Sequence, residues 1–364
     1  MVQALSALVV LCTITETCLS NSPSPLFVHS TTGPDGEFFP CTRIPTALAV
    51  PGTSVRLAFA ECRRWVGDGC EPAGLPTPVH VDQGDRFICM KRSVDAGCTW
   101  GGLISNITKV RSTNPSVVWD LHAAAVRLFF SADDPQQRVN GIHAVQSTDF
   151  GVTWTAPVAQ HVEGTGAKLL GGVGPGNAVV SGRRSDGTIL LALASHLHHP
   201  EPVTPKDSNI TRTFDTWVYT STVGGDDHWT LAEGDLPFIG ETQLALLVDG
   251  TIMLNSRCAD SGHGPGNPPD RRYPSPCHCH NRAVARSTDA GRSFGPISFD
   301  VGLPDPNCQG SILQLSGDSH GRVAFCNPSS RRGRVNMTLH FSTDATAQTW
   351  VHADFLSLSS CLSL

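Results

Sequence analysis

The sequence lacks the features that attract nucleic acid or insert a chain into a membrane. Charged residues make up only 16% of its 364 residues, the formal net charge is -6, and no lysine runs occur. No stretch is long and apolar enough to span a bilayer. We therefore expect no nucleic-acid partner and no transmembrane segment, and an anionic ligand would need a local group of arginines.

Turn-forming residues, in contrast, are abundant. The chain has 35 glycines and 26 prolines, and 40% of its residues are hydrophobic. This combination gives enough apolar side chains for a large core but interrupts long helices. The composition predicts an all-β protein with short strands.

The cysteines and the amino-terminal residues bear on the compartment. Thirteen cysteines are many for a cytosolic chain of this size, and the odd number leaves at least one outside any internal pairing. The apolar run Ala4–Cys12 predicts a signal peptide within residues 1–20, although a buried first strand is the alternative. Sequons at Asn106, Asn209 and Asn336 agree with export. We expect a glycoprotein that is secreted or lies in the lumen of lysosomes or other endomembranes.

One motif recurs along the chain, with clear copies that start at Ser93, Ser147 and Ser287 and degraded copies that start at Ser221 and Ser342. Each clear copy has Ser, Asp, Gly and a closing Trp or Phe at fixed spacing. Ser and Asp side chains cap backbone amides of a tight turn, and Gly supplies the positive φ of the reversal. The intervals leave room for a four-stranded blade, so the repeat predicts a β-propeller.

This repeat resembles the Asp-box, or bacterial neuraminidase repeat, of sialidases. The resemblance implies a six-bladed β-propeller of the sialidase type over residues 30–364, with a last blade that is incomplete. It also implies that the repeat turns lie away from the centre of the propeller and carry no chemistry. Because interaction proteins carry the repeat too, it indicates architecture more strongly than function.

A second pattern places charged residues at strand ends. Glu241 and Arg257 flank two strand-like runs joined by the turn Asp249-Gly250. A hairpin of this kind brings its two far ends together, so we expect Glu241 and Arg257 to lie side by side. Arg43, Arg257 and Arg334 come from three different blades, and such a group is suited to one planar anion, because guanidinium groups bind a carboxylate bidentately.

The surroundings of these residues resemble those of exo-alpha-sialidases. Arg43 begins Arg-Ile-Pro, and Arg334 precedes Val-Asn-Met-Thr-Leu, with Arg331 and Arg332 as close competitors for its place. The resemblance implies that Arg43, Arg257 and Arg334 bind the substrate carboxylate and that Glu241 is the catalytic base.

The stretch after Arg43 supplies the remaining site candidates. By the resemblance Arg63 lines the substrate pocket and Asp68 is the catalytic acid, with Asp82 and Asp85 as rivals. Asn114, which precedes a proline, is a further pocket candidate, and a plain turn residue is the alternative.

The family's chemistry uses a neutral nucleophile. A carboxylate would approach the fixed carboxylate of sialic acid at short range, whereas a tyrosine does not. The resemblance implies retaining hydrolysis of terminal sialic acid from glycoproteins, gangliosides, other glycolipids or oligosaccharides, without a cofactor or a metal.

Tyrosine is scarce in this chain. Only Tyr219 and Tyr273 are present, and both precede Arg334, whereas the family's tyrosine follows the last arginine. Two interpretations follow: an exo-alpha-sialidase whose sequence is truncated here, or a sialic-acid-binding propeller that lacks the nucleophile.

One further group of potential ligands occurs at Cys277-His-Cys-His280. Its spacing is too tight for a standard zinc finger, and disulfides are favoured in an exported chain. We therefore expect no metal there.

Overall fold

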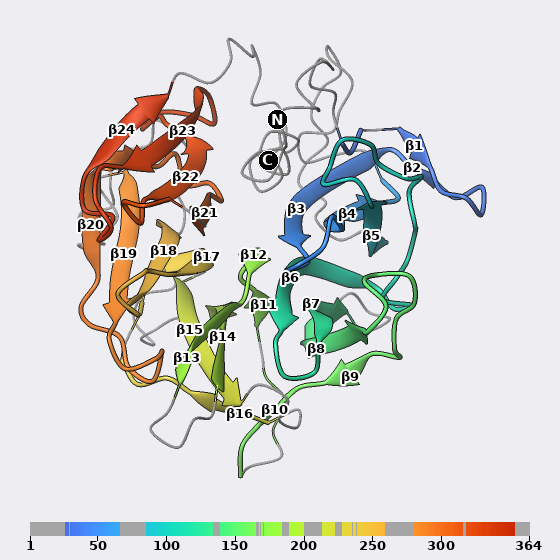
Figure 1. Ribbon diagram of the computed structural model, residues 1–364, viewed down its shortest axis with the longest axis horizontal. Helices are drawn as coiled ribbons and strands as arrows, with labels where there is room; N and C mark the ends of the chain where they lie inside the picture. Colours follow the sequence, from blue (N-terminus) through green and yellow to red (C-terminus); the bar gives the residue numbers. More distant parts are fainter. Residues whose placement is uncertain are drawn as a thin grey trace, which may run out of the picture. The chain divides into compact units, whose positions relative to one another are not determined.

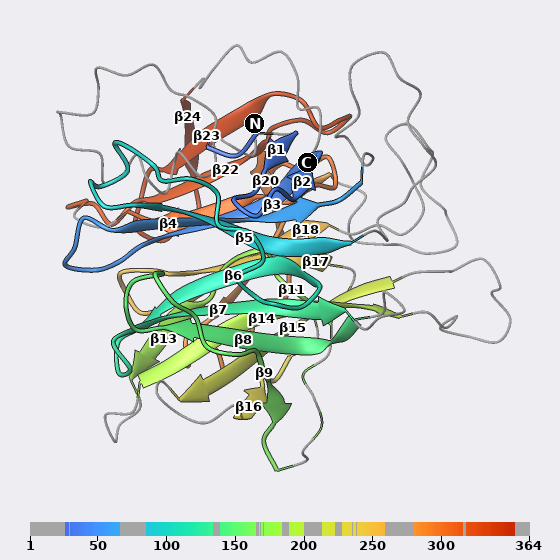
Figure 2. The ribbon, with the colours of Figure 1, turned by 90° about the vertical axis from the view of Figure 1, so that its right-hand side faces the viewer.

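The computed structural model describes residues 26–28, 30–65, 85–133, 139–164, 167, 169, 171–183, 189–199, 213–222, 228–234, 236–237, 239–258, 280–315 and 318–353. All regular elements of these residues are β-strands, which confirms the all-β class (Figure 1; Figure 2). The chain divides into two compact units. Unit 1 is made chiefly of Met1–Asn177, and unit 2 of Ala178–Thr222 and His228–Cys361.

Unit 1 contains two larger sheets of mainly antiparallel strands. The first consists of β3 (Cys41–Ala49), β4 (Arg56–Arg63) and β5 (Arg86–Ser93) in that order. The second runs through β6 (Ser112–Asp120), β7 (Ala125–Asp133), β8 (Val139–Ser147) and β9 (Val158–Ala159), with β12 (Gly176–Asn177) parallel to β6. The short strands β1 (Thr31–Thr32), β2 (Phe38–Phe39), β10 (His161–Val162) and β11 (Gly172–Val173) also belong to this unit.

The core of unit 1 lies where these two sheets face each other. Its buried side chains come from β4 to β8 and include Leu57, Ile88, Val117, Leu128 and Val145. Strands β4 and β7 are buried along their whole length, so both of their faces are covered. Both strands accordingly contain apolar runs without strict alternation, Leu57–Ala60 in β4 and Leu128–Phe130 in β7.

Unit 2 contains three antiparallel sheets. The first has β13 (Val179–Arg183), β14 (Ile189–His199), β15 (Thr213–Thr222) and β16 (His228–Leu231). The second has β17 (Ile239–Leu246), β18 (Ile252–Cys258), β19 (Asn281–Ser287) and β20 (Ser298–Pro304). The third has β21 (Ser311–Gln314), β22 (Val323–Pro328), β23 (Met337–Ser342) and β24 (Trp350–Ala353).

Two apolar layers join the sheets of unit 2. One packs β14 and β15 against the sheet of β17, and includes Ala192, Val218 and Leu254. The other packs that sheet against β22 and includes Met253 and Phe325. Sheets packed face to face in chain order are the arrangement that the repeat predicted.

The repeat turns have the predicted hydrogen bonds. At Ser287 the hydroxyl donates to Asp289 Oδ1 (2.7 Å) and accepts the Gly291 amide (2.8 Å). Asp289 also accepts the amide (2.9 Å) and the hydroxyl (2.6 Å) of Ser293. Gly291 has φ 86°, but the preceding Ala290 also has a positive φ of 63°, which the sequence did not predict. The same pair of positive φ values occurs in the other two clear copies.

The last copy of the repeat forms its turn without glycine. Ala347 takes the positive φ, at 52°. Asp344 still accepts the amide (2.7 Å) of Thr346 and the hydroxyl (3.0 Å) of Thr349. Asp344 therefore still caps the turn although this copy has one extra residue. The turn differs from the clear copies, as expected, because alanine and not glycine has the positive φ.

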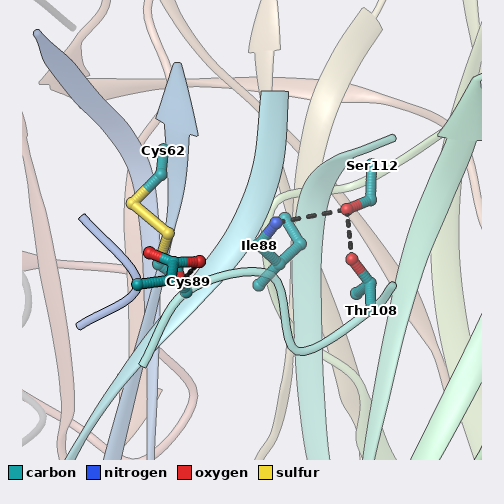
Figure 3. Close-up of a disulfide and its surroundings, with 7 residues drawn as sticks. Cys62, Ile88, Cys89, Thr108 and Ser112 are labelled. Carbon is teal, nitrogen blue, oxygen red and sulfur yellow. Dashed lines mark hydrogen bonds between the residues drawn. A yellow bond between two sulfur atoms is a disulfide. The ribbon is translucent and has the colours of Figure 1, made fainter. Parts of the chain in front are cut away.

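A disulfide between Cys62 of β4 and Cys89 of β5 links adjacent strands of the first sheet (Figure 3). Next to it the Ile88 amide donates to Ser112 Oγ (3.1 Å), and this hydroxyl lies 2.6 Å from that of Thr108. These contacts tie β5 to the beginning of β6. The disulfide holds β4 to β5, and the buried hydroxyls hold β5 to β6.

We expect the aspartate side chains that cap the repeat turns to contribute measurably to the stability of the protein. Asp289→Ala removes three hydrogen bonds within one turn, so we expect the free energy of unfolding to fall by about 1–2 kcal/mol in urea titrations. Asp249→Ala is a matched control, since among the described residues the Asp249 side chain accepts only the Thr251 amide, at an exposed turn. A loss at Asp289 no larger than at Asp249 would contradict the capping role.

Candidate functional site

The candidate residues fall in both units. Arg43, Arg63 and Asn114 lie in unit 1, and Glu241, Arg257 and Arg334 lie in unit 2. Asp68, the expected acid, lies outside the described residues, as does its rival Asp82.

The hairpin of β17 and β18 brings Glu241 and Arg257 together, as the sequence predicted. Gly240 pairs with Arg257, and the register shifts between Gly240 and Thr242, so that Glu241 occupies a bulge. Its φ is 45°, a left-handed value that is uncommon for a residue with a Cβ atom. The bulge takes Glu241 out of the alternation of the strand and allows its carboxylate to reach the Arg257 guanidinium.

A chain of buried hydroxyls holds this bulge in place. Ser256 Oγ donates to the Gly240 carbonyl (2.9 Å) and lies 2.7 Å from Thr242 Oγ1. Thr242 Oγ1 in turn lies 2.8 Å from Thr216 Oγ1, which donates to the Ile239 carbonyl (2.9 Å). The carbonyl groups of the two residues that precede Glu241 are therefore satisfied, which helps the strained conformation to persist.

Arg257 is held on two sides. Its Nη1 donates to Glu241 Oε2, and its Nε donates to Asn307 Oδ1. The side chains of Arg257 and Glu241 are each 20% exposed, so the ion pair is open to a ligand. Burial raises the pKa of Glu241. The charge and hydrogen bond of Arg257, with smaller contributions from His196 and Arg334, outweigh burial and lower the pKa to about 2. Glu241 is therefore ionised at neutral pH.

Arg334 approaches the same place from the segment before β23. Its Nη2 donates to the Asn307 carbonyl (3.3 Å), so Asn307 accepts from Arg257 through its side chain and from Arg334 through its backbone. The competitor Arg331 instead donates twice to Asn281 Oδ1 (3.2 and 3.0 Å), and Arg332 is exposed. Of the three neighbouring arginines, Arg334 is the one that joins Arg257 at Asn307.

A buried histidine that the sequence analysis missed lies beside this group. His196 is 7% exposed in the middle of β14 and pairs with Thr216, a member of the hydroxyl chain. Burial lowers its pKa to about 4, against the opposing influence of Glu241. The imidazole is therefore neutral at physiological pH and does not add to the positive charge.

In unit 1, Arg43 and Arg63 flank a buried glutamate. Arg43 lies on β3, is 4% exposed and pairs in register with Glu61 of β4. Arg63 donates to Glu61 Oε2 from Nε (2.9 Å) and from Nη2 (2.7 Å). Glu61 is fully buried, and burial raises its pKa, but Arg63 and then Arg86 lower it below the ordinary value. Arg63 is thus fixed by a buried ion pair in which two of its N–H groups donate to one carboxylate oxygen.

Glu61 also fixes Asn114. Its Oε1 accepts a hydrogen bond from the backbone amide of Asn114 (2.8 Å) and another from the Thr113 hydroxyl. Asn114 lies on a bulge of β6, with φ 54°, and not in a turn. The same carboxylate therefore positions two of the predicted pocket residues.

The bulges form a pattern that the sequence analysis did not find. Ile44 of β3, Asn114 of β6 and Glu241 of β17 have positive φ and lie at a register shift in the first strand of their sheet. In each case the bulge includes or adjoins a predicted site residue. A left-handed residue other than glycine has no distinct sequence signature, which is why it was missed.

Other candidates give no support for a metal or a membrane helix. In the described part of the chain, no three His, Cys, Asp or Glu side chains are grouped closely enough to hold a metal ion. Within the Cys277-His-Cys-His280 motif only His280 is described. The described residues contain no helix with the length and apolarity needed to cross a membrane.

The two tyrosines lie apart from the arginines in sequence. Tyr219 is 2% exposed in β15, and its ring meets that of Trp217 edge-on at 6.4 Å between centroids. Tyr273 lies outside the described residues. The burial of Tyr219 agrees with a core residue.

Comparison with known proteins identifies the repeat. Residues 81–360 match the family described as BNR repeat-like domain. An exo-alpha-sialidase of Arthroderma benhamiae is 28% identical over 79% of this chain and 56% of its own length. A sialidase of Micromonospora viridifaciens is 26% identical over 90% of this chain and 48% of its own, and mouse Sialidase-4 is 29% identical over 74% and 53%. The chain spans about half the length of these curated relatives.

Solved structures show the same fold. A Hadza microbial sialidase has a TM-score of 0.59 at 20% identity, with 85% of this chain and 57% of that chain covered. The NanB sialidase of Streptococcus pneumoniae has a TM-score of 0.60 at 14% identity, with 90% and 63% covered. The fold is therefore the β-propeller of the sialidase type, and the chain belongs to the family described as BNR repeat-like domain.

Proposed function

We propose that this protein is an exo-alpha-sialidase that hydrolyses terminal sialic acid from glycoproteins, glycolipids such as gangliosides, or oligosaccharides. The observation that carries the proposal is the group formed by Glu241, Arg257 and Arg334 around Asn307. It supplies two guanidinium groups and an ionised carboxylate, at the sequence positions that the family resemblance assigns to chemistry. The relatives named as sialidases support the same conclusion.

The arginines account for substrate binding. Sialic acid carries a carboxylate on its anomeric carbon, and guanidinium groups bind carboxylates bidentately without losing their charge. In this proposal Arg43, Arg257 and Arg334 hold the carboxylate, and Arg63 and Asn114 line the pocket. Glu61 keeps Arg63 and Asn114 rigid, so little ordering of these residues remains to be done when the sugar binds.

The proposed reaction retains the configuration of the sugar. A tyrosine oxygen attacks the anomeric carbon while Glu241 takes the phenol proton, and Asp68 protonates the leaving glycosidic oxygen. Water then attacks the anomeric carbon from the face opposite the tyrosine, Asp68 takes the water proton, and Glu241 returns its proton to the departing tyrosine oxygen. The low pKa of Glu241, about 2, keeps it ionised before the proton transfer.

A second candidate function follows from the tyrosines. Tyr219 and Tyr273 both precede Arg334, and Tyr219 is buried in β15. Without an accessible tyrosine the same arginines would bind sialosides and not cleave them. Binding without turnover is therefore the alternative, and it uses the same carboxylate site.

We also propose that the protein is exported to an oxidising compartment. Cys62 is bonded to Cys89, and Cys41, Cys98 and Cys258 are also disulfide-bonded, which is typical of secreted or lumenal proteins. Asn336, the acceptor residue of one sequon, is exposed, as a glycosylated asparagine requires.

The binding step predicts a specific pattern of losses. Arg257→Ala and Arg334→Ala should each weaken binding of the glycal of N-acetylneuraminic acid by about a hundredfold, because each removes a charged donor to the carboxylate. Arg332→Ala is the matched control and should bind as the unchanged protein does, because Arg332 is exposed. Calorimetric titration measures all three. Equal affinities for the Arg257 and Arg332 variants would rule out the proposed site.

Turnover separates the two functions. If the protein is an enzyme, it releases the fluorophore from a fluorogenic aryl sialoside, and Glu241→Gln lowers the rate by about a hundredfold or more through loss of the base. Binding of the glycal should fall much less than the rate, because the glutamine keeps a side-chain oxygen that can accept from Arg257. If the unchanged protein binds the glycal and shows no turnover, the binding function is correct and the hydrolase is not.

A further inference from the structure

A buried ion pair in unit 2 has no role in the proposed chemistry. Arg282 of β19 and Asp305, which follows β20, are 0% and 1% exposed, and Arg282 Nη1 lies 3.5 Å from Asp305 Oδ2. Burial lowers the pKa of Arg282, although Asp305 opposes this effect. Desolvation makes such a pair a poor source of stability compared with apolar side chains, so its presence invites a functional explanation.

The Asp305 carboxylate joins two segments that carry site residues. Its Oδ2 accepts the Cys258 amide (2.9 Å), and its Oδ1 accepts the Cys308 amide (3.0 Å). Cys258 directly follows Arg257, and Cys308 directly follows Asn307. One side chain therefore fixes the backbone next to both members of the Arg257–Asn307 hydrogen bond.

Asn307 needs this support because it accepts from both arginines. It takes the Arg257 Nε–H on its side chain and the Arg334 Nη2–H on its carbonyl, and it does so at φ 60°. A residue in this left-handed conformation is held by its neighbours and not by its own preference. A shift of the turn would move the acceptor shared by Arg257 and Arg334.

Arg282 secures the other side of the turn. Its Nη1 donates to the Cys308 carbonyl (2.6 Å), and its Nε donates to Asn255 Oδ1 (2.7 Å). The Arg282 guanidinium also affects the net charge of the group around Asn307. Glu241 and Asp305 oppose Arg257, Arg282 and Arg334, so these five groups carry an excess of one positive charge, which favours an anionic ligand.

We propose that Asp305, with Arg282 as its buried counter-ion, is the positioning residue that aims Arg257 and Arg334 at the carboxylate of the ligand. The inference rests on the proposed sialoside site and deepens it. Neither Asp305 nor Arg282 touches the sugar. Each acts through the Asn307 turn, so their loss should weaken recognition of the carboxylate specifically.

The test compares two ligands that differ only at the carboxylate. The glycal of N-acetylneuraminic acid and its methyl ester are titrated into the full chain and into Asp305→Asn. An asparagine of the same shape has one carbonyl oxygen in place of two acceptors, so one of the two amides loses its partner. We expect affinity for the acid to fall about tenfold or more, and affinity for the ester to change less than about twofold.

Matched variants separate positioning from general damage. Asp300→Asn makes the same change on β20, the strand that precedes Asp305. Asp300 accepts from Trp350 Nε1 and from the Gly302 amide. This variant should leave the acid-to-ester ratio unchanged. Arg282→Lys, which keeps the charge, should retain more affinity for the acid than Arg282→Met. If the Asp305 and Arg282 variants do not fold, Asn307→Ala tests the positioning role in their place. This variant removes the side-chain oxygen that accepts from Arg257 and leaves the Arg282–Asp305 pair intact.

Three outcomes would overturn the proposal. Unchanged affinity for both ligands in Asp305→Asn, or in Asn307→Ala if that variant has to decide, contradicts a positioning role. So does an equal loss for both ligands, which indicates a purely structural role. If the unchanged protein does not bind the acid, the proposed sialoside site itself fails, and this inference fails with it.

Discussion

A guanidinium group at the end of a β-strand stays in one orientation only if its acceptors are fixed, and this requirement organises unit 2. Arg257 has two such acceptors, the Glu241 carboxylate and the Asn307 side-chain oxygen. Each is presented from a left-handed residue, at φ 45° and 60°. Two strained backbone positions therefore face one arginine, and the buried contacts around them keep these positions in place.

Those contacts explain why so many polar groups are buried near the site. The hydroxyls of Thr216, Thr242 and Ser256 hold the Glu241 bulge, and the Asp305–Arg282 pair holds the Asn307 turn. In unit 1, Glu61 plays a similar part for Arg63 and Asn114. Polar networks of this kind contribute little to stability but restrict geometry, which is what a carboxylate site requires.

The sequence predicted the elements whose determinants are local. The repeat turns follow from Ser, Asp and Gly at fixed spacing, and the Glu241–Arg257 contact follows from a hairpin closed by Asp249-Gly250. The choice of Arg334 over Arg331 came from the resemblance, and Asn281 explains it physically, because Asn281 engages Arg331. The roles of Asn307 and of the Arg282–Asp305 pair were missed because they depend on segments that are distant in the sequence. The bulges were missed because a left-handed residue other than glycine has no distinct sequence signature. Arg282, a charged residue inside a strand, gives no sign in the sequence that it is buried.

The central claim is that Arg257 and Arg334 form one carboxylate site around Asn307. A crystal structure of the full chain with the glycal of N-acetylneuraminic acid tests it most directly. The account predicts the ligand carboxylate within hydrogen-bonding distance of both guanidinium groups, with Asn307 still accepting from Arg257. A carboxylate bound elsewhere, or one that contacts neither arginine, would contradict it.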